Sequence, residues 1–123
     1  MDLARLKQAL QQLPIDTLLS EIPEVQNSIA HLLKSNEAMR EFDPKGEDRD
    51  LTEAIEENQA LMERHENRID LTLRVIKERL GEAAAYEVGS NVDAFRKEHP
   101  TKPVVPENQK QQQEQEQEEG VFL

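Results

Sequence analysis

The side chains that could support acid–base or metal chemistry in this chain are three histidines and many carboxylates. The histidines are His31, His65 and His99, and the chain has no cysteine. A di-metal site of the Glu-x-x-His type needs a carboxylate three residues before the histidine, and Met62 stands at that place before His65. The sequence also lacks the HExxH motif, a phosphate-binding glycine loop and the GxSxG nucleophile elbow. These residues therefore predict no enzyme, no metal site and no cofactor.

Composition excludes further classes of function. Of 123 residues, 26 are acidic and 15 basic, for a net charge of −11, and 36% are hydrophobic. This length allows one small domain, but the apolar supply is thin for a compact core. The acidic balance argues against binding nucleic acid or an anionic membrane, which need clustered basic residues. The one basic cluster, over residues 64–79, is interleaved with carboxylates.

The sequence gives no sign of membrane insertion or secretion. It has no run of about 18 apolar residues, which a membrane-spanning helix would need. The first ten residues carry three charges and lack the apolar core of a signal peptide. We therefore expect an acidic, soluble, intracellular protein.

Two long stretches, 15–42 and 51–80, carry the clearest structural signal. In each, a series of positions alternates in steps of three and four, which is typical of the a and d positions of a coiled coil. A polar segment with Pro44 and Gly46 lies between them and favours a turn, so we expect an antiparallel hairpin. The two series are Ile15, Leu18, Ile22, Val25, Ile29, Leu32, Asn36 and Met39, and then Ile55, Asn58, Met62, His65, Ile69, Thr72, Ile76 and Arg79.

The two series also predict the register of the hairpin. A fold at residue 47 brings every position of the first series opposite one of the second, from Met39 with Ile55 to Ile15 with Arg79. In this register Asn36 faces Asn58, and a buried asparagine pair fixes register at a cost in stability. A register slipped by one turn is the alternative. Pro23 lies inside the first stretch, where we expect a kink or a restart and not one unbroken helix.

The remaining segments complete an all-α fold. A short N-terminal helix is predicted over 2–13, where leucines recur before Pro14, and a weaker helix over 82–97 follows Gly81. The domain then covers 1–97 as a helical hairpin (coiled coil) with helices at about 2–13, 15–42, 51–80 and 82–97. Residues 98–123 form a Gln/Glu-rich acidic tail ending in a hydrophobic tripeptide, which we expect to be disordered.

Some apolar residues lie beside the predicted seam, which is formed by the facing a and d positions of the two helices. Four leucines at e positions share one flank of the hairpin, which either the N-terminal helix covers or a partner helix binds. The opposite flank carries smaller residues and forms either a solvated surface or a shallow groove. The first flank consists of Leu19, Leu33, Leu73 and Leu80; the second consists of Ser28, Ser35, Ala54, Leu61, Arg68 and Val75.

Residues 24–36, EVQNSIAHLLKSN, resemble a known family. The E-x-x-NSI-x-HL-x-x-SN pattern is similar to the signature of the fungal ATPase-dedicated proteasome assembly chaperone, the translation-machinery-associated protein 17 family. The resemblance implies a non-enzymatic chaperone that binds the N-terminal coiled coil of an ATPase subunit in the base of the proteasome regulatory particle and promotes ATPase pairing. It also implies a cytoplasmic and nuclear location and a part in the stress response. The matched outward positions are Asn27, Ser28, His31 and Ser35.

The last three residues suggest a second contact. Val121, Phe122 and Leu123 resemble the hydrophobic–aromatic–any tripeptide with which proteasome activators enter pockets of the core particle, with Phe122 where tyrosine is usual. An ordinary chain end is the alternative. For the whole chain, the alternative function is a structural coiled-coil adaptor or a prefoldin-like subunit of a stable complex. We expect a monomer when no partner is bound.

Overall fold

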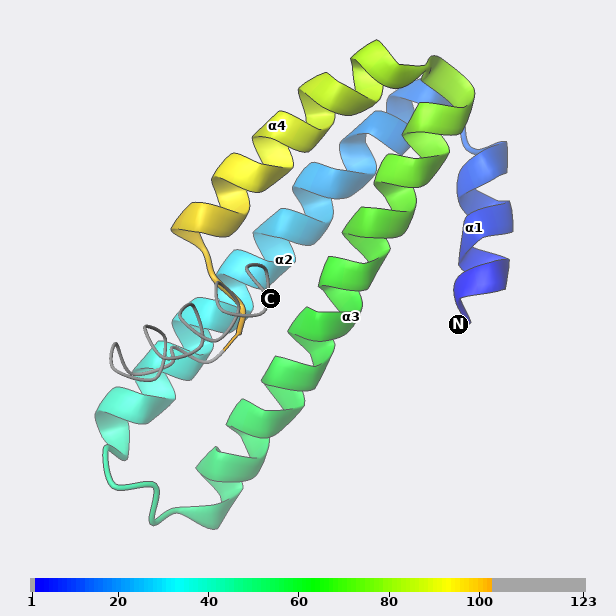
Figure 1. Cartoon of the computed structure of the whole chain (residues 1–123). Helices are drawn as coiled ribbons and strands as arrows, with labels where there is room; N and C mark the ends of the chain where they lie inside the picture. Colours follow the sequence, from blue (N-terminus) through cyan, green and yellow to red (C-terminus); the bar gives the residue numbers. More distant parts are fainter. Residues whose placement is uncertain (1, 103–123) are drawn as a thin grey trace, which may run out of the picture.

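The computed structural model describes residues 2–102, which fold into four α-helices (Figure 1). No strand occurs within this described range. The helices are α1 (Leu3–Gln12), α2 (Ile15–Phe42), α3 (Arg49–Leu80) and α4 (Glu82–Glu98). The all-α class is thus confirmed, and a helix occupies each of the four predicted segments. The predicted tail begins inside α4 at Glu98, and from residue 103 on it lies outside the described residues.

Aspartate side chains cap the start of α1 and of α3 and hold the hairpin turn. The Asp2 carboxylate accepts a hydrogen bond from Arg5 N at 2.8 Å, and the Asp48 carboxylate accepts one from Leu51 N at 3.2 Å. Both satisfy amides that the first turn of a helix leaves without a partner. Between α2 and α3, the Asp43 carboxylate accepts hydrogen bonds from the backbone amides of Glu47 and Asp48 at 3.1 and 2.9 Å. The turn is therefore held by its own side chains.

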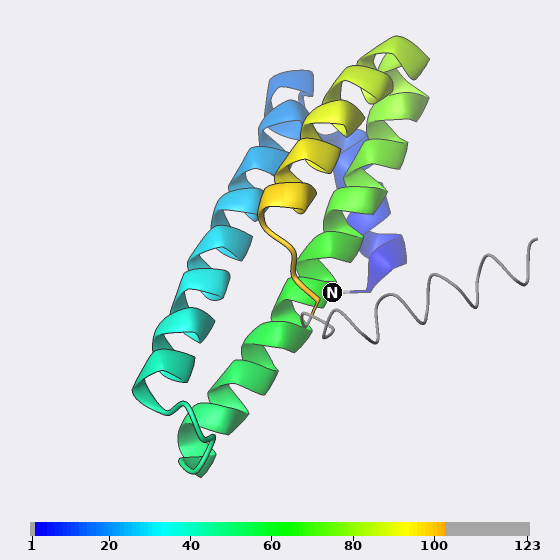
Figure 2. The same cartoon turned by 60° about the vertical axis from the view of Figure 1, so that its left-hand side comes forward.

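Helices α2 and α3 run antiparallel beside each other, as Figures 1 and 2 show. The nine buried residues that belong to the predicted series all lie between these helices or beside them. Asn58 Nδ2 donates a hydrogen bond of 2.9 Å to Asn36 Oδ1, so the predicted asparagine pair is confirmed. The buried members of the two series are Leu18, Ile22, Val25, Ile29 and Asn36 from α2, and Met62, Ile69, Thr72 and Ile76 from α3.

The expected interruption at Pro23 was wrong. Helix α2 runs from Ile15 to Phe42 without a break and contains Pro23 in its interior. The ring is exposed, and Ile22 and Val25 on either side are buried against the core. Proline costs a helix one backbone hydrogen bond. Because the missing bond lies on the solvent side, water can bind the carbonyl that is left, and burial of the neighbours keeps the helix continuous.

The predicted seam also ends one layer earlier than expected. Ile15 is 46% exposed, and Arg79, its predicted opposite, is exposed as well. The Arg79 guanidinium instead donates hydrogen bonds through Nη1 to the carbonyl oxygens of Leu10 and Leu13, at 3.2 and 2.6 Å. The Leu10 carbonyl also accepts a 3.4 Å hydrogen bond from Leu13 N, and Leu13 is the residue that caps the C-terminal end of α1. Arg79 therefore fastens α1 to α3.

Helices α1 and α4 lie on opposite sides of α3 (Figures 1 and 2). On the α1 side, Leu10 is buried together with Leu71 and Val75 of α3. Lys7 Nζ lies 3.4 Å from a carboxylate oxygen of Glu78 and adds an ion pair there. On the other side, α4 returns along the end of the hairpin remote from the turn, with Val92 only 1% exposed. The core is thus a hairpin enlarged by one helix on each side.

Candidate partner-binding surface

The leucine flank of the hairpin is occupied within the chain itself. Leu33, Leu73 and Leu80 are half-buried against the core cluster, in company with side chains of α4. Of the four predicted leucines only Leu19 is largely open, at 38% exposure. Coverage by the N-terminal helix was one of the two alternatives, and it was wrong, because the helix that packs on α3 on this side is α4. Helix α1 packs on the other side of α3, where Leu71 and Val75 offer it an apolar surface.

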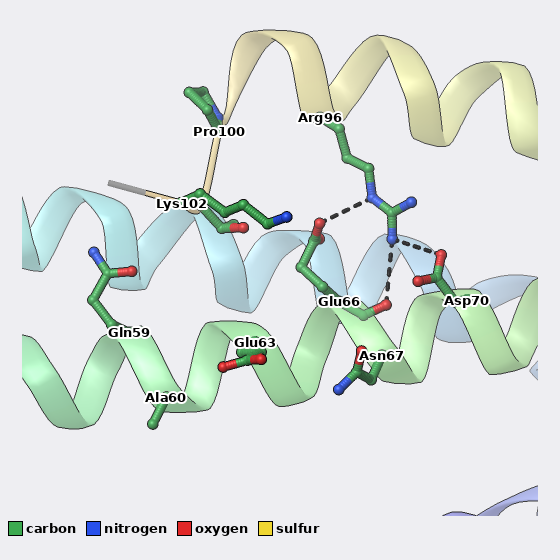
Figure 3. Close-up of a pocket in the computed structure, with 10 residues that line it drawn as sticks. Gln59, Ala60, Glu63, Glu66, Asn67, Asp70, Arg96, Pro100 and Lys102 are labelled. Carbon is green, nitrogen blue, oxygen red and sulfur yellow. Dashed lines mark hydrogen bonds and ion pairs between the residues drawn. The ribbon is translucent and has the colours of Figure 1, made fainter. Parts of the chain in front are cut away.

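Arg96 holds the C-terminal half of α4 on α3 (Figure 3). Its Nε lies 2.9 Å from Glu66 Oε2, and its Nη2 lies 2.9 Å from Asp70 Oδ1 and 3.3 Å from the backbone oxygen of Glu66. Glu66 and Asp70 are four residues apart and lie on one face of α3. One guanidinium therefore contacts three oxygens, and its side chain is only 30% exposed. Such charge-assisted contacts are stronger than neutral hydrogen bonds.

The contacts of Arg96 with Glu66 and Asp70 are called the Arg96 clamp. A cavity of about 840 Å³ lies beside this clamp, between α3 and the segment that follows α4. Its floor is the face of α3 that carries Glu63, Glu66 and Asp70, and Pro100 and Lys102 lie over it. Phe95 and His99 stack with ring centroids 4.2 Å apart where α4 ends. Beyond Arg96, the chain therefore continues along the rim of this cavity, where Thr101 is half-buried and Pro100 and Lys102 are exposed.

The outward residues of the signature segment remain open on α2. Asn27, Ser28, His31 and Ser35 are all exposed. Ser28 Oγ donates a 3.3 Å hydrogen bond to the backbone oxygen of Glu24, so this hydroxyl turns back toward its own helix. The seam residues of the same segment, Ile29 and Asn36, are fully buried. The structure therefore separates the signature into a buried half and an exposed half, as the heptad positions predict.

The opposite flank is only partly solvated. Val75 is fully buried, and Arg68 extends to Glu21 of α2 as an ion pair across the hairpin. Toward the turn, Ser28 and Ser35 are exposed, and Ala54 and Leu61 are half-buried. The two members at the α1 end, Arg68 and Val75, therefore serve contacts within the molecule, and the part toward the turn is more open.

Several exposed apolar side chains escaped sequence reasoning. Phe42 is 82% exposed at the last turn of α2, and Tyr86 is 79% exposed on α4. Phe42 lies one heptad after Ser35, at a g position, so the heptad count could have identified it. Tyr86 lies between the apolar positions of α4 and had no such signal. Leu3 and Ile15 are also exposed, near the two ends of α1.

The basic cluster of α3 is largely used within the molecule. Arg68 binds Glu21, and Arg79 binds the end of α1. Lys77 Nζ lies 4.0 Å from a carboxylate oxygen of Glu82, a pair that is mostly exposed. Arg74 lines a smaller cavity between α1 and α3. These side chains are therefore not arranged as one basic surface.

His65 lies at a seam position, half-buried, near two arginines of its own helix. Burial, the Arg68 charge and the Arg64 charge, in that order, lower the pKa of His65 below its usual 6.5. Both effects favour the neutral imidazole. Within residues 2–102, no group of three or more potential ligand side chains is placed to hold a metal ion. No helix in that range combines the length and the apolar character that crossing a membrane requires.

Comparison with known proteins gives one match. The family described as the TMA17 helical domain matches residues 2–82, which is more than half of the chain and contains α1, α2 and α3. Searches of the curated proteins and of the solved structures found no match. The matched range includes the signature segment 24–36 and ends where α4 begins. The chain belongs to the TMA17 family.

Proposed function

We propose that this protein is an assembly chaperone of the proteasome regulatory particle. It binds the N-terminal coiled coil of one ATPase subunit of the base and promotes the pairing of that subunit with its neighbour. The observation that carries the proposal is the family match over residues 2–82. A slender helical hairpin with exposed signature residues is a suitable partner for another coiled coil. The protein acts by binding alone, as a monomer, without catalysis, metal or cofactor.

The exposed half of the signature is the surface that we assign to first contact with the ATPase. Asn27, Ser28, His31 and Ser35 lie on α2 and are not covered by α1 or α4. Small and polar side chains allow a partner helix to approach the backbone closely. Phe42, at 82% exposure, extends the same flank and offers an aromatic anchor. The binding surface therefore runs from the middle of α2 toward the turn.

The proposal has consequences for location and for other ligands. An assembly factor of proteasomes works where they assemble, so we place it in the cytoplasm and the nucleus. The intramolecular use of Arg68 and Arg79 and the net charge of −11 support a function without nucleic acid or membrane. A second contact, with the core particle, would come from the C-terminal tripeptide Val121, Phe122 and Leu123, which lies outside the described residues. It would raise the effective concentration of the hairpin at the ATPase.

The test is an ATPase pairing assay with purified proteins. Two neighbouring base ATPases are mixed with and without the chain, and pair formation is followed by size-exclusion chromatography with light scattering. We expect more pairs with the chain present, and we expect the chain to be absent from the finished regulatory particle. A chain that remains in the particle at one copy would instead indicate the structural adaptor or prefoldin-like subunit.

A matched pair of variants tests the surface. Ser35→Arg places a long charged side chain on the signature face, and Ala9→Arg places the same side chain at an exposed position of α1. We expect Ser35→Arg to reduce pairing activity at least tenfold and Ala9→Arg to leave it unchanged. Equal activity of both variants would remove the signature face from the proposal.

A further inference from the structure

We propose that α4 is a displaceable lid on a second part of the client site, and that a helix of the client takes its place in the groove between α2 and α3. This inference rests on the function proposed above and assigns it a regulated step. The client helix is amphipathic, with an apolar stripe for the leucine flank and a lysine or arginine for Glu66 and Asp70. The seated helix α4 shows this chemistry directly.

The groove selects a helix of this kind. Helix α4 inserts Val92 into the core, and an apolar stripe on either side of it packs there too, at positions Ala84, Ala85, Val88 and Phe95. The spacing is that of one helix face. The half-buried leucines of the flank, Leu33, Leu73 and Leu80, pack against the same core cluster. Any helix with the same stripe can therefore fill the groove in place of α4.

Charge complementarity adds the second requirement. Arg96 contacts both carboxylates of the Glu66–Asp70 pair and the Glu66 backbone oxygen. When α4 leaves, this acidic pair is open to water, and a helix that covers it again without a basic residue would bury unpaired charge, which is costly. A basic residue of the incoming helix restores the pairing. The groove consequently disfavours acidic or purely apolar helices.

Helix α4 is a weak helix that depends on the groove. Its middle reads Val88, Gly89, Ser90, Asn91 and Val92, five residues of below-average helix propensity. Its N-cap residue, Gly81, has no side chain that could bond the first turn. Most of the stability of a helix in a protein comes from packing of its apolar face and not from propensity. Because its helical form depends on packing, α4 loses its helix when another helix takes the groove.

The connection to α3 permits this movement. One residue, Gly81, separates the two helices, and its φ of 95° lies where side-chain-bearing residues rarely go. The family match ends at residue 82, at this junction, so the matched range does not include the body of α4. At the other end, a cavity lies between Pro100, Lys102 and the face of α3 that carries Glu63 and Glu66. Opening therefore turns about Gly81 and requires release of the Arg96 contacts with Glu66 and Asp70.

A closed lid reduces the apparent affinity for the client by the fraction of molecules that are open. Two substitutions move this fraction in opposite directions. Arg96→Glu sets three carboxylates against each other and opens the lid. Gly89→Ala raises the helix propensity of α4 and keeps the lid closed. The added Cβ meets no atom within 4 Å, so it causes no clash. Lys97→Glu makes the same charge change as Arg96→Glu on an exposed neighbouring residue and is the control.

The experiment is a titration of the full-length chain and its variants with the ATPase coiled-coil segment, each variant first checked by circular dichroism. We expect Arg96→Glu to bind at least fivefold more tightly than Lys97→Glu. We expect Gly89→Ala to bind up to about fivefold more weakly than the unaltered chain. One glycine-to-alanine change stabilises a helix by about 1 kcal/mol, which reduces the fraction of open molecules by about that factor. Hydrogen exchange of the unaltered chain provides a readout without substitution, and amides 82–98 should lose protection when the client binds.

The outcomes separate this inference from the function it rests on. If the unaltered chain binds the segment while Arg96→Glu matches Lys97→Glu and amides 82–98 keep their protection, the lid is refuted and the chaperone function stands. If Arg96→Glu fails to fold, the exchange measurement alone decides. If neither the unaltered chain nor the opened variant binds any ATPase segment, both proposals fall.

Discussion

Asn58 Nδ2 donates a hydrogen bond of 2.9 Å to Oδ1 of Asn36, and Asn36 is fully buried between α2 and α3. Two facing asparagines can form two hydrogen bonds, but the second one is missing here. Asn36 Nδ2 has no hydrogen-bond partner among residues 2–102. The pair therefore contributes one good bond and leaves one buried donor unsatisfied. The pair instead fixes the register of the hairpin, because a slip by one layer would place the Asn36 amide against an apolar residue.

Replacing both asparagines with leucine should raise the melting temperature. The double variant Asn36→Leu/Asn58→Leu removes the unsatisfied donor and adds apolar burial. The single variant Asn58→Leu should be less stable than the unaltered chain by about 1–3 kcal/mol, because it leaves Asn36 buried without any partner. Thermal unfolding followed by circular dichroism measures both. A double variant less stable than the unaltered chain would contradict this account.

The double variant should also loosen the register of the hairpin. The chain has no cysteine, so spin labels can be attached at two introduced cysteines on the exposed faces of α2 and α3. We expect a broader distribution of label distances in the double variant than in the unaltered background. An equally narrow distribution would assign the register to the remaining seam residues.

The hairpin could be predicted because its information is local and repeated. Buried seam residues such as Leu18, Ile29 and Ile76 all occur at steps of three and four, and the asparagines sit at mirrored places in the two series. A single register satisfies all of these positions together. The same periodicity explains why the outward half of the signature is exposed.

The placement of α1 and α4 could not be predicted from the same signal. Each has a short apolar stripe, and a stripe does not say which flank of a hairpin it will cover. The decision depends on Leu71 and Val75, which lie off the seam series and receive α1, and on the Arg96 clamp, which positions α4. Long-range contacts of this kind leave no periodic trace in a single sequence. The exposure of Tyr86 likewise follows from the final arrangement, whereas Phe42 lies at a g position that the heptad count identifies.

Replacing Pro23 with alanine should stabilise the protein by about 2 kcal/mol. Alanine restores a backbone hydrogen bond inside α2, and part of the gain is offset because the unfolded chain becomes more flexible. The side chain at this position is exposed, so no packing is lost. Urea unfolding provides the measurement. A loss of stability would mean that the proline shapes α2 to fit against α3.

We expect His65 to lower the free energy of unfolding at acid pH. Its pKa is lowered in the folded protein below the usual 6.5, so below that pH the unfolded chain binds a proton more readily than the folded one. Stability is therefore unaffected by this group above pH 6.5, falls as the pH drops toward the lowered pKa, and is level again below it.

The histidine effect is isolated by comparing variants at several pH values. His65→Gln should remove that part of the pH dependence between pH 7 and 5, while His31→Gln, at an exposed position, should leave the profile of the unaltered chain in place. Carboxylates contribute equally to all three proteins, so the differences report the histidine. Parallel profiles for His65→Gln and the unaltered chain would show that the site does not favour neutral imidazole.

Removing the Arg79 guanidinium should release α1. Arg79→Met keeps the length of the side chain but loses the hydrogen bonds to the Leu10 and Leu13 carbonyls, at a cost of about 1 kcal/mol. Hydrogen exchange of residues 3–12 should become faster, with little change in α4. Lys77→Met, a similar loss of charge two residues earlier, is the control. Equal exchange in both variants would show that α1 is held by its leucines alone.

The central claim is that this chain binds the coiled coil of a base ATPase. The most direct measurement is titration calorimetry of the full-length protein against the isolated N-terminal coiled-coil segment of each proteasomal ATPase. The account predicts saturable binding of one molecule to one segment, at micromolar affinity or tighter, for one ATPase and not for the others. Absence of binding to every segment would contradict it and would favour the structural adaptor.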